Sequence, residues 1–297
     1  MAITERNIQQ IGKSFLITLP KQWATAFNLK KGSKLKIMTS EQGNLLISPE
    51  FIEKKASRET EMVFDSYFKR KFYREYLEGN DRITIILKNG AEKDRKEIRS
   101  FLKNFMNIQI IDESESKIVL KCFKIEELSI EECLKRMYFL SLNLFEDIGR
   151  EKSGIQEIRD IMTRFYYMLV MQTRRFLSEG KFTKENQIPI IRALDFRMAA
   201  EKVQRVGAII SGMEGMDKEL LGLFGKARKN YSDSVLYFIG NDYGKAIVLW
   251  KEIKDERVAA EKLCARFFRE KNIRMYKKTQ DILEILRYAK EISMLIR

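Results

Sequence analysis

The sequence predicts an α+β protein with a small β-rich N-terminal region, a mixed middle region and a long helical region. Three patterns predict this class. Apolar residues alternate within short segments of the first fifty residues, a β-α-β-β pattern follows, and helical periodicity runs from Ser129 to the end. We therefore divide the chain into residues 1–50, 51–125 and 126–297.

Short strands and turns are expected in residues 1–50. The alternating apolar residues are Phe15, Ile17 and Leu19, then Leu35 and Ile37, then Leu45 and Ile47, with turns at Gly32-Ser33 and Gln42-Gly43-Asn44. Between the strands, Pro20 begins a short helical turn, since its missing N–H costs little at that position. Trp23, Ala26 and Phe27 share one face of this turn before Asn28 ends it.

The segment from about 51 to 80 is interpreted as a connecting helix that closes at Gly79-Asn80. It carries six aromatic residues, namely Phe64, Tyr67, Phe68, Phe72, Tyr73 and Tyr76. Packing in a core or an interface is the favoured role of these rings, and a platform for stacking bases is the alternative.

A small subdomain is predicted next. Its strand covers Ile83–Leu87, an Asn89-Gly90 turn leads to a helix near 91–105, and two further strands lie near 108–111 and 118–120. The order is β-α-β-β.

Six helices are expected from Ser129 onward. The Ser129-Ile130-Glu131-Glu132 segment is a capping box, in which serine and glutamate satisfy the free N–H groups of a helix start. The pattern breaks near 150–153, 180–183, 212–216, 240 and 271–274, where Gly149, Gly180, Gly212, Gly215 and Gly240 fall at or close to the breaks. These breaks divide the region into two three-helix halves, near 126–212 and 214–297, which suggests a weak internal repeat.

Composition excludes several classes of function. The chain has 56 Lys and Arg against 42 Asp and Glu, a formal charge of +14, which favours a polyanionic partner. Histidine is absent, so serine-type triads and histidine-based zinc sites are excluded. The glycines form no phosphate-binding loop. We therefore expect no enzyme, no catalytic residue and no cofactor.

The sequence also indicates a cytoplasmic protein without membrane insertion. Charged residues interrupt every apolar run, and the first residues lack the apolar core of a secretory signal. Cys122, Cys133 and Cys264 are odd in number and lie in apolar segments, so we interpret them as reduced packing residues.

The N-terminal region resembles the AbrB/SpoVT/MazE family. The resemblance rests on two segments, Gly12-Lys13-Ser14-Phe15-Leu16-Ile17-Thr18-Leu19-Pro20-Lys21-Gln22-Trp23 and Asn28-Leu29-Lys30-Lys31-Gly32-Ser33-Lys34-Leu35-Lys36-Ile37. It implies a swapped-hairpin β-barrel formed by an obligate homodimer, which binds double-stranded DNA through basic residues on its β surface and loops.

The same resemblance implies the DNA-binding residues. Two basic positions of the family's DNA-binding members fall on Arg6 and Lys13, and we add Ser14 and Lys21, the latter as a substitute for missing arginines. Those two arginines of the family correspond to Ala24 and Thr25 here. This departure leaves two possibilities open, DNA contact by this domain or dimerisation alone.

The helical region resembles archaeal PhoU-related proteins in Arg159–Val170 and Glu201–Ala208. The resemblance implies two three-helix bundles and a role in regulating phosphate uptake, through contact with a transporter or kinase. Metal-binding members carry acids at positions that are Gln204 and Ala208 here, and the segment Leu286–Lys290 also lacks them. We therefore expect no metal site.

A late basic segment is a possible second anion or DNA contact. It contains Arg266, Arg269, Lys271, Arg274, Lys277 and Lys278, interleaved with aromatic residues. The alternative is a solvated helix end stabilised by the C-terminal dipole.

Together these observations predict a homodimeric transcriptional regulator linked to phosphate supply. The alternative is an adaptor that does not bind DNA, in which the N-terminal domain only dimerises the chain and the bundle docks on a transporter or kinase.

Overall fold

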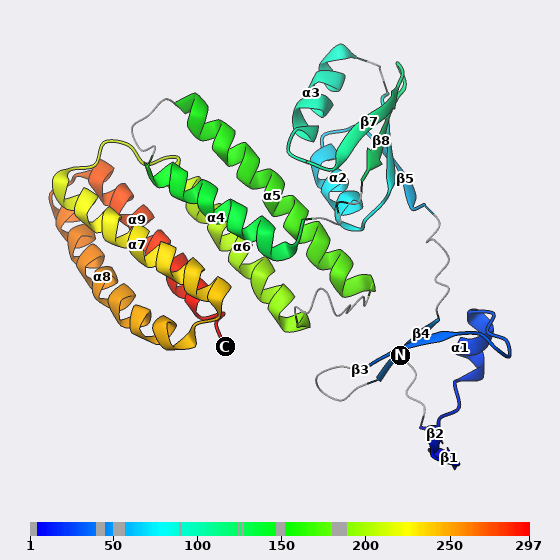
Figure 1. Cartoon of the computed structure of the whole chain (residues 1–297). Coiled ribbons are helices and arrows are strands. Elements are labelled where there is room, and N and C mark those ends of the chain that lie inside the picture. Colours follow the sequence, from blue (N-terminus) through cyan, green and yellow to red (C-terminus); the bar gives the residue numbers. More distant parts are fainter. Residues whose placement is uncertain are drawn as a thin grey trace. The chain divides into compact units, whose positions relative to one another are not determined.

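The computed structural model describes residues 5–39, 45–49, 57–88, 91–123, 125, 128–146, 152–179 and 189–297 (Figure 1). It has two compact units, Met1–Ser57 and Arg58–Arg297, and each is described by itself below. The predicted α+β class is confirmed, with a small strand region before a largely helical one. The turns predicted at Gln42-Gly43-Asn44 and Asn89-Gly90, and the helix breaks at Gly149 and Gly180, lie outside the described residues.

The first unit contains two antiparallel hairpins and one short helix. Strands β1 (Gln9–Ile11) and β2 (Ser14–Leu16) form one hairpin, and β3 (Leu35–Thr39) pairs with β4 (Leu45–Pro49) in the other. Helix α1 (Lys21–Ala26) lies between them, as predicted. The alternation at Phe15, Ile17 and Leu19 predicted a longer strand, whereas β2 ends at Leu16; β1 was not predicted because two of its three residues are glutamine.

The segment from 51 to 80 is not one connecting helix. Its described part begins with strand β5 (Glu59–Val63), and helix α2 covers only Phe68–Leu77. Strand β5 forms because it pairs in parallel with β6 (Arg82–Ile86), with Met62 opposite Ile85. The strand depends on this long-range pairing, and its charge-rich sequence shows no strict alternation of apolar and polar residues. The sequence pattern alone therefore did not predict it.

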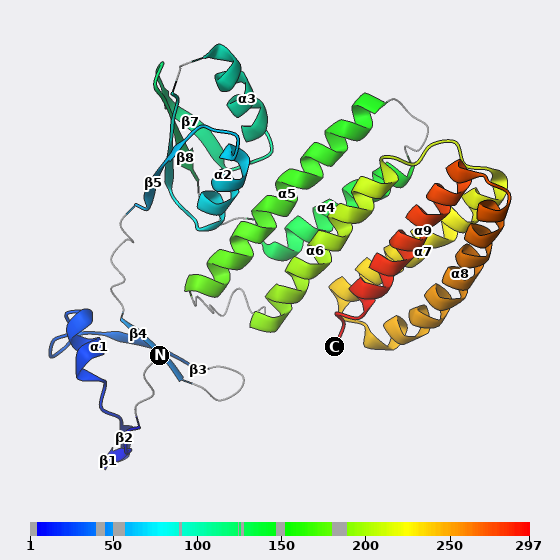
Figure 2. The ribbon, with the colours of Figure 1, turned by 180° about the vertical axis from the view of Figure 1, so that it is seen from behind.

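The second unit opens with a four-stranded sheet in the order β5-β6-β8-β7. Strands β7 (Ile108–Glu113) and β8 (Lys117–Cys122) form an antiparallel hairpin, and α3 (Glu92–Leu102) precedes them. Helices α2 and α3 cover the same face of the sheet (Figures 1 and 2). The subdomain is therefore β-α-β-α-β-β, one strand and one helix larger than predicted.

Aromatic rings fill the core beneath these helices. Phe68, Phe72 and Tyr76 are buried and contact Phe101 or Phe105 edge to face. Tyr67 is the exception among the six predicted aromatic residues, because it is largely exposed. The packing interpretation of these rings is confirmed for the buried members.

Helices make up the rest of the second unit. Their bounds are α4 (Ile130–Glu146), α5 (Lys152–Glu179), α6 (Ile190–Ile210), α7 (Lys218–Gly240), α8 (Tyr243–Arg269) and α9 (Ile273–Ser293). Helices α4 to α6 pack on one another, and so do α7 to α9. That these two groups are repeats stays a prediction. Over the described part of the chain, every helix is too short or too polar to cross a bilayer.

Side-chain caps fix several helix starts. The predicted capping box forms, because the Ser129 N–H donates to Glu132 Oε2 at 2.7 Å and the Glu132 N–H donates to Ser129 Oγ at 3.1 Å. The carboxylates of Asp217 and Asp242 and the amide oxygen of Asn272 accept from the first turns of α7, α8 and α9. Each cap satisfies an N–H that the helix itself leaves without a partner.

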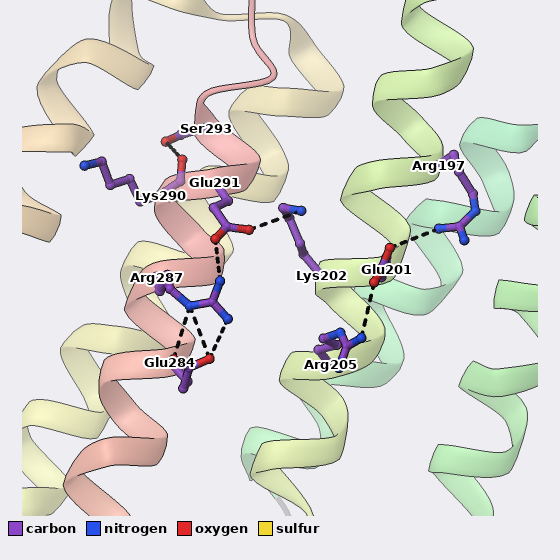
Figure 3. A network of polar contacts seen from close by, with 9 residues as sticks. All are labelled: Arg197, Glu201, Lys202, Arg205, Glu284, Arg287, Lys290, Glu291 and Ser293. Carbon is purple, nitrogen blue, oxygen red and sulfur yellow. Dashed lines mark hydrogen bonds and ion pairs between the residues drawn. The ribbon is translucent and has the colours of Figure 1, made fainter.

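Polar contacts join the two helical groups within their shared apolar core. The hydroxyl groups of Ser141 on α4 and Tyr231 on α7 lie 2.7 Å apart, and Tyr231 is fully buried. Nearer the surface, Lys202 of α6 pairs with Glu291 of α9 at 3.2 Å, and Arg287 donates to the same carboxylate (Figure 3). In addition to apolar packing, the Lys202–Glu291 pair therefore joins α6 to α9, and the Ser141–Tyr231 contact joins α4 to α7.

The cysteines are free and buried, in agreement with their interpretation as packing residues. Burial raises the pKa of the Cys122 and Cys133 thiols to about 12, and it also raises the pKa of the Cys264 thiol. The reactive thiolate is therefore depleted at neutral pH.

Substitution Tyr231→Phe should lower the free energy of unfolding by about 1–2 kcal/mol, because the Ser141 hydroxyl loses a buried partner. Urea denaturation measures this change. Tyr67→Phe is the matched control. The Tyr67 side chain is exposed, so the loss of its hydroxyl group should leave the midpoint of urea denaturation unchanged.

The three thiols of the native protein should react slowly with a chromogenic disulfide reagent at pH 8, and all should react at once in guanidinium chloride. The raised pKa values of Cys122 and Cys133 keep these two thiols protonated well above pH 8, and burial blocks access to all three. A thiol that reacts rapidly in the native protein would contradict the packing assigned to that residue.

Candidate nucleic-acid interface

A tight hairpin turn presents the first predicted DNA-binding residues. Residues Ile11 and Ser14 are paired, so Gly12 and Lys13 form a two-residue loop. Gly12 has a φ of +61°, which glycine adopts without the penalty of a side chain, and such loops favour glycine for this reason. The turn places Lys13 at the hairpin tip and Ser14 directly beside it.

All four predicted residues are exposed to solvent in the first unit. These residues are Arg6, Lys13, Ser14 and Lys21. Arg6 precedes β1 at the open end of the hairpin, and its guanidinium donates to the neighbouring Glu5 carbonyl at 3.1 Å. Lys21 is the first residue of α1. Lys13 and Ser14 are adjacent at the hairpin tip, whereas Arg6 lies beyond the opposite end of the hairpin.

A second turn adds cations that the prediction did not assign to the site. Gly32 has a φ of +85°, and the Ser33 N–H donates to the Lys30 carbonyl at 2.9 Å. This turn exposes Lys30 and Lys31. The signal was present in the sequence, because residues 1–38 hold seven Lys or Arg and a single acid.

Helix α1 carries the positions where the sequence departs from the family's arginines. Ala24 is half-buried and its N–H donates to the Pro20 carbonyl at 3.0 Å, whereas Thr25 is exposed. Trp23 and Phe27 pack against each other with ring centroids 5.4 Å apart. Lys21 is therefore the only charged residue of α1.

The apolar side chains of this unit are mostly exposed. Phe15 is 74% exposed, Ile11 68% and Ile37 63%. Among the residues of the unit whose burial is described, Pro49 alone is buried. Hairpins of two strands are marginal on their own, and a set of exposed apolar residues marks an interaction surface.

The late basic segment is only partly available to a ligand. Arg266 pairs with Glu219 at 2.6 Å, and Lys278 is buried and donates to the Glu214 carbonyl. The Arg274 guanidinium lies against Gly215, in the space where a Cβ would project. Arg269, Lys271 and Lys277 are exposed at the junction of α8 and α9. The six residues therefore lie close in sequence, but they do not form one uniform cationic surface.

The segments compared above with the metal-binding segments of PhoU proteins lie on α6 and α9. Gln204 and Ala208 line a groove between α5 and α6 with Arg159 and Arg205. Glu201 accepts from Arg197 and Arg205, and Arg287 donates to Glu284 at 2.6 Å (Figure 3). Nowhere in the described ranges do three His, Cys, Asp or Glu side chains come together as metal ligands would.

Comparison with known families gives one match. Residues 8–56 match the family model described as antidote-toxin recognition MazE, bacterial antitoxin. No curated protein and no solved structure matches the chain. The match agrees with the AbrB/MazE-type resemblance of the N-terminal region, and the resemblance of the helices to PhoU stays a prediction. The N-terminal residues 8–56 are therefore similar to a MazE-type antitoxin domain.

Proposed function

We propose that this chain is a homodimeric, DNA-binding transcriptional regulator whose helical part receives a signal linked to phosphate supply. The observation that carries the proposal is the set of exposed lysines, Lys13, Lys21, Lys30 and Lys31, within a segment that matches the MazE family model. The proposal assigns the chain no catalytic role and no cofactor. Because the proposed partner is chromosomal DNA, it also assigns a cytoplasmic location.

The exposed apolar residues of the first unit support pairing with a second copy. At roughly 25 cal/mol per Å² of apolar surface, side chains such as Phe15 and Ile37 stabilise a fold only when they leave water. The described hairpins bury little of this surface alone. Interleaving with the hairpins of a second chain supplies both the missing core and the missing strand neighbours.

Such a dimer also compensates for the distance between the predicted cations within one chain. Arg6 and Lys13 lie at opposite ends of one hairpin, but two chains contribute two copies of each. The seven cations of residues 1–38 become fourteen against two acids, which concentrates positive charge for phosphate contacts. Arg6, Lys13 and Lys21 are all suited to phosphate contacts, and Arg6 is also suited to bidentate contact with a guanine edge.

The link to phosphate supply rests on the resemblance of the helical part to PhoU proteins. In this proposal, the helices bind a transporter or a signalling protein and thereby alter the grip of the N-terminal unit on DNA. This part of the proposal is independent of DNA binding itself.

A second candidate is an adaptor in which the N-terminal unit only dimerises. The uncharged residues Ala24 and Thr25 favour it, because they remove two cations at positions of the family's DNA surface. In the adaptor, the helices still dock on a transporter or kinase, but no duplex is bound.

Substitution Phe15→Asp in the full chain should convert the dimer to a monomer, because a charge would replace an apolar residue at the proposed interface. Light scattering coupled to size exclusion measures the mass directly. Tyr67→Asp places the same charge at a similarly exposed position of the second unit and should leave the dimer intact. A Phe15→Asp chain that remains dimeric would move the interface elsewhere.

DNA affinity should fall steeply with salt. If Arg6, Lys13 and Lys21 of two chains contact six phosphates, the logarithm of the association constant should fall by about five per decade of salt. Lys13→Ala should reduce this slope by about two, since the dimer loses two contacts. Fluorescence anisotropy with a labelled duplex measures both slopes.

Two further variants complete the titration. Lys93→Ala removes an exposed lysine of α3 and should leave the slope unchanged. Lys277→Ala tests the late basic segment, and a reduced slope would extend the DNA footprint to it. A dimer that binds no duplex even at low salt would exclude the regulator and favour the adaptor.

A further inference from the structure

A second candidate site lies inside the second unit, far in sequence from the hairpins. A pocket of about 490 Å³ opens where the end of α3, strand β7 and the middle of α5 meet. Its walls come from the α/β subdomain and from the helical part, which lie side by side (Figure 1). None of its residues belongs to the DNA interface proposed above.

The floor of the pocket is apolar. Leu102, Phe105 and Ile108 are buried there, and Met106 and Ile110 are half-buried. The side chains of Ile108 and Ile110 both line the floor, because alternate residues of a strand point to the same face. Phe105 is fixed in place, since its ring stacks on Tyr167 of α5 with centroids 5.2 Å apart. The floor is therefore built from the ordered core of the subdomain.

The rim of the pocket is cationic. It carries Arg99, Lys103 and Arg164, and none of the described residues that line the pocket is acidic. Arg99 already pairs with Glu113 at 2.8 Å. In the described part of the chain, no carboxylate pairs with Arg164 or Lys103, and the Nε atom of Arg164 is buried without a hydrogen-bond partner. Two cations at the rim are thus left without a counter-ion.

We propose that this pocket binds a small organic carboxylate with an apolar body. The body would cover the floor, where it replaces water against five apolar side chains, and the carboxylate would accept from the guanidinium of Arg164 and the ammonium of Lys103. A guanidinium matches a carboxylate with two parallel hydrogen bonds. An inorganic anion would pair with the cations but would leave the apolar floor in contact with water. A neutral apolar molecule would cover the floor but would leave the cations without a counter-ion.

The position of the pocket gives binding a structural consequence. A bound carboxylate touches α3 and β7 on one side and α5 on the other, so it adds a contact between the subdomain and the helices. It binds the folded state only, and it therefore raises the melting temperature of the second unit as its concentration increases.

Isothermal titration calorimetry of the full chain with decanoate, kept below its critical micelle concentration, tests the site. Acetate carries the charge without the body, and 1-decanol carries the body without the charge. Decanoate should bind saturably, acetate should show no heat of binding, and decanol should bind at least about tenfold more weakly than decanoate. Equal binding of decanol and decanoate would overturn the proposal, as would the absence of saturable decanoate binding.

Variants locate the bound molecule. Arg164→Gln and Lys103→Gln should each weaken decanoate binding about tenfold or more, because each removes a charged hydrogen bond. Lys93→Gln, on an exposed turn of α3 away from the pocket, should bind as the wild type does. Lys103 is exposed, so its variant should keep the wild-type melting temperature without ligand. Unchanged affinity in both pocket variants would place the decanoate elsewhere and overturn the proposal.

Discussion

The small first unit is limited by how little apolar surface it can bury against itself. Its described elements are two hairpins and a six-residue helix, and most of their apolar side chains face solvent. The second unit has no such shortage, because continuous apolar clusters run through its sheet and its helices. The proposed dimer follows from this difference: pairing supplies a core to the unit that lacks one, and it gathers the cations that one chain keeps apart.

The turns decide where the charges of the first unit are presented. Gly12 and Gly32 adopt positive φ values, and each turn carries lysines at its exposed end. A side chain at either position would strain the turn. Backbone geometry therefore sets the placement of Lys13, Lys30 and Lys31, while the excess of seven Lys and Arg over one acid in residues 1–38 sets the sign of the field. Exposed cations of this kind suit the phosphate contacts proposed above.

Helix α5 connects the subdomain with the other helices in the second unit. Its Tyr167 packs against Tyr73 and Phe105, and its Arg174 donates to the Leu77 carbonyl at 2.9 Å. The same helix packs on α4 and α6. A ligand in the pocket beside Arg164 would therefore act on the one described helix that makes ring contacts with the subdomain and packs within the bundle. A ligand in the pocket could therefore affect the helical part directly through α5, whichever partner the helices contact.

The sequence by itself determined the α+β class, the helix start at Ser129 and the similarity of the N-terminal region to MazE-type domains. These features depend on local signals: periodicity, the Ser129 capping box, glycines at breaks and a contiguous motif. Only the tertiary structure decided that residues 59–63 form a strand, because that strand depends on parallel pairing with β6. It also decided that Arg266 and Lys278 are engaged in internal contacts while Lys277 is exposed, and that Arg99, Lys103 and Arg164 meet at one pocket. Such groupings join residues far apart in the chain, and no local pattern specifies which distant side chains a fold will bring together.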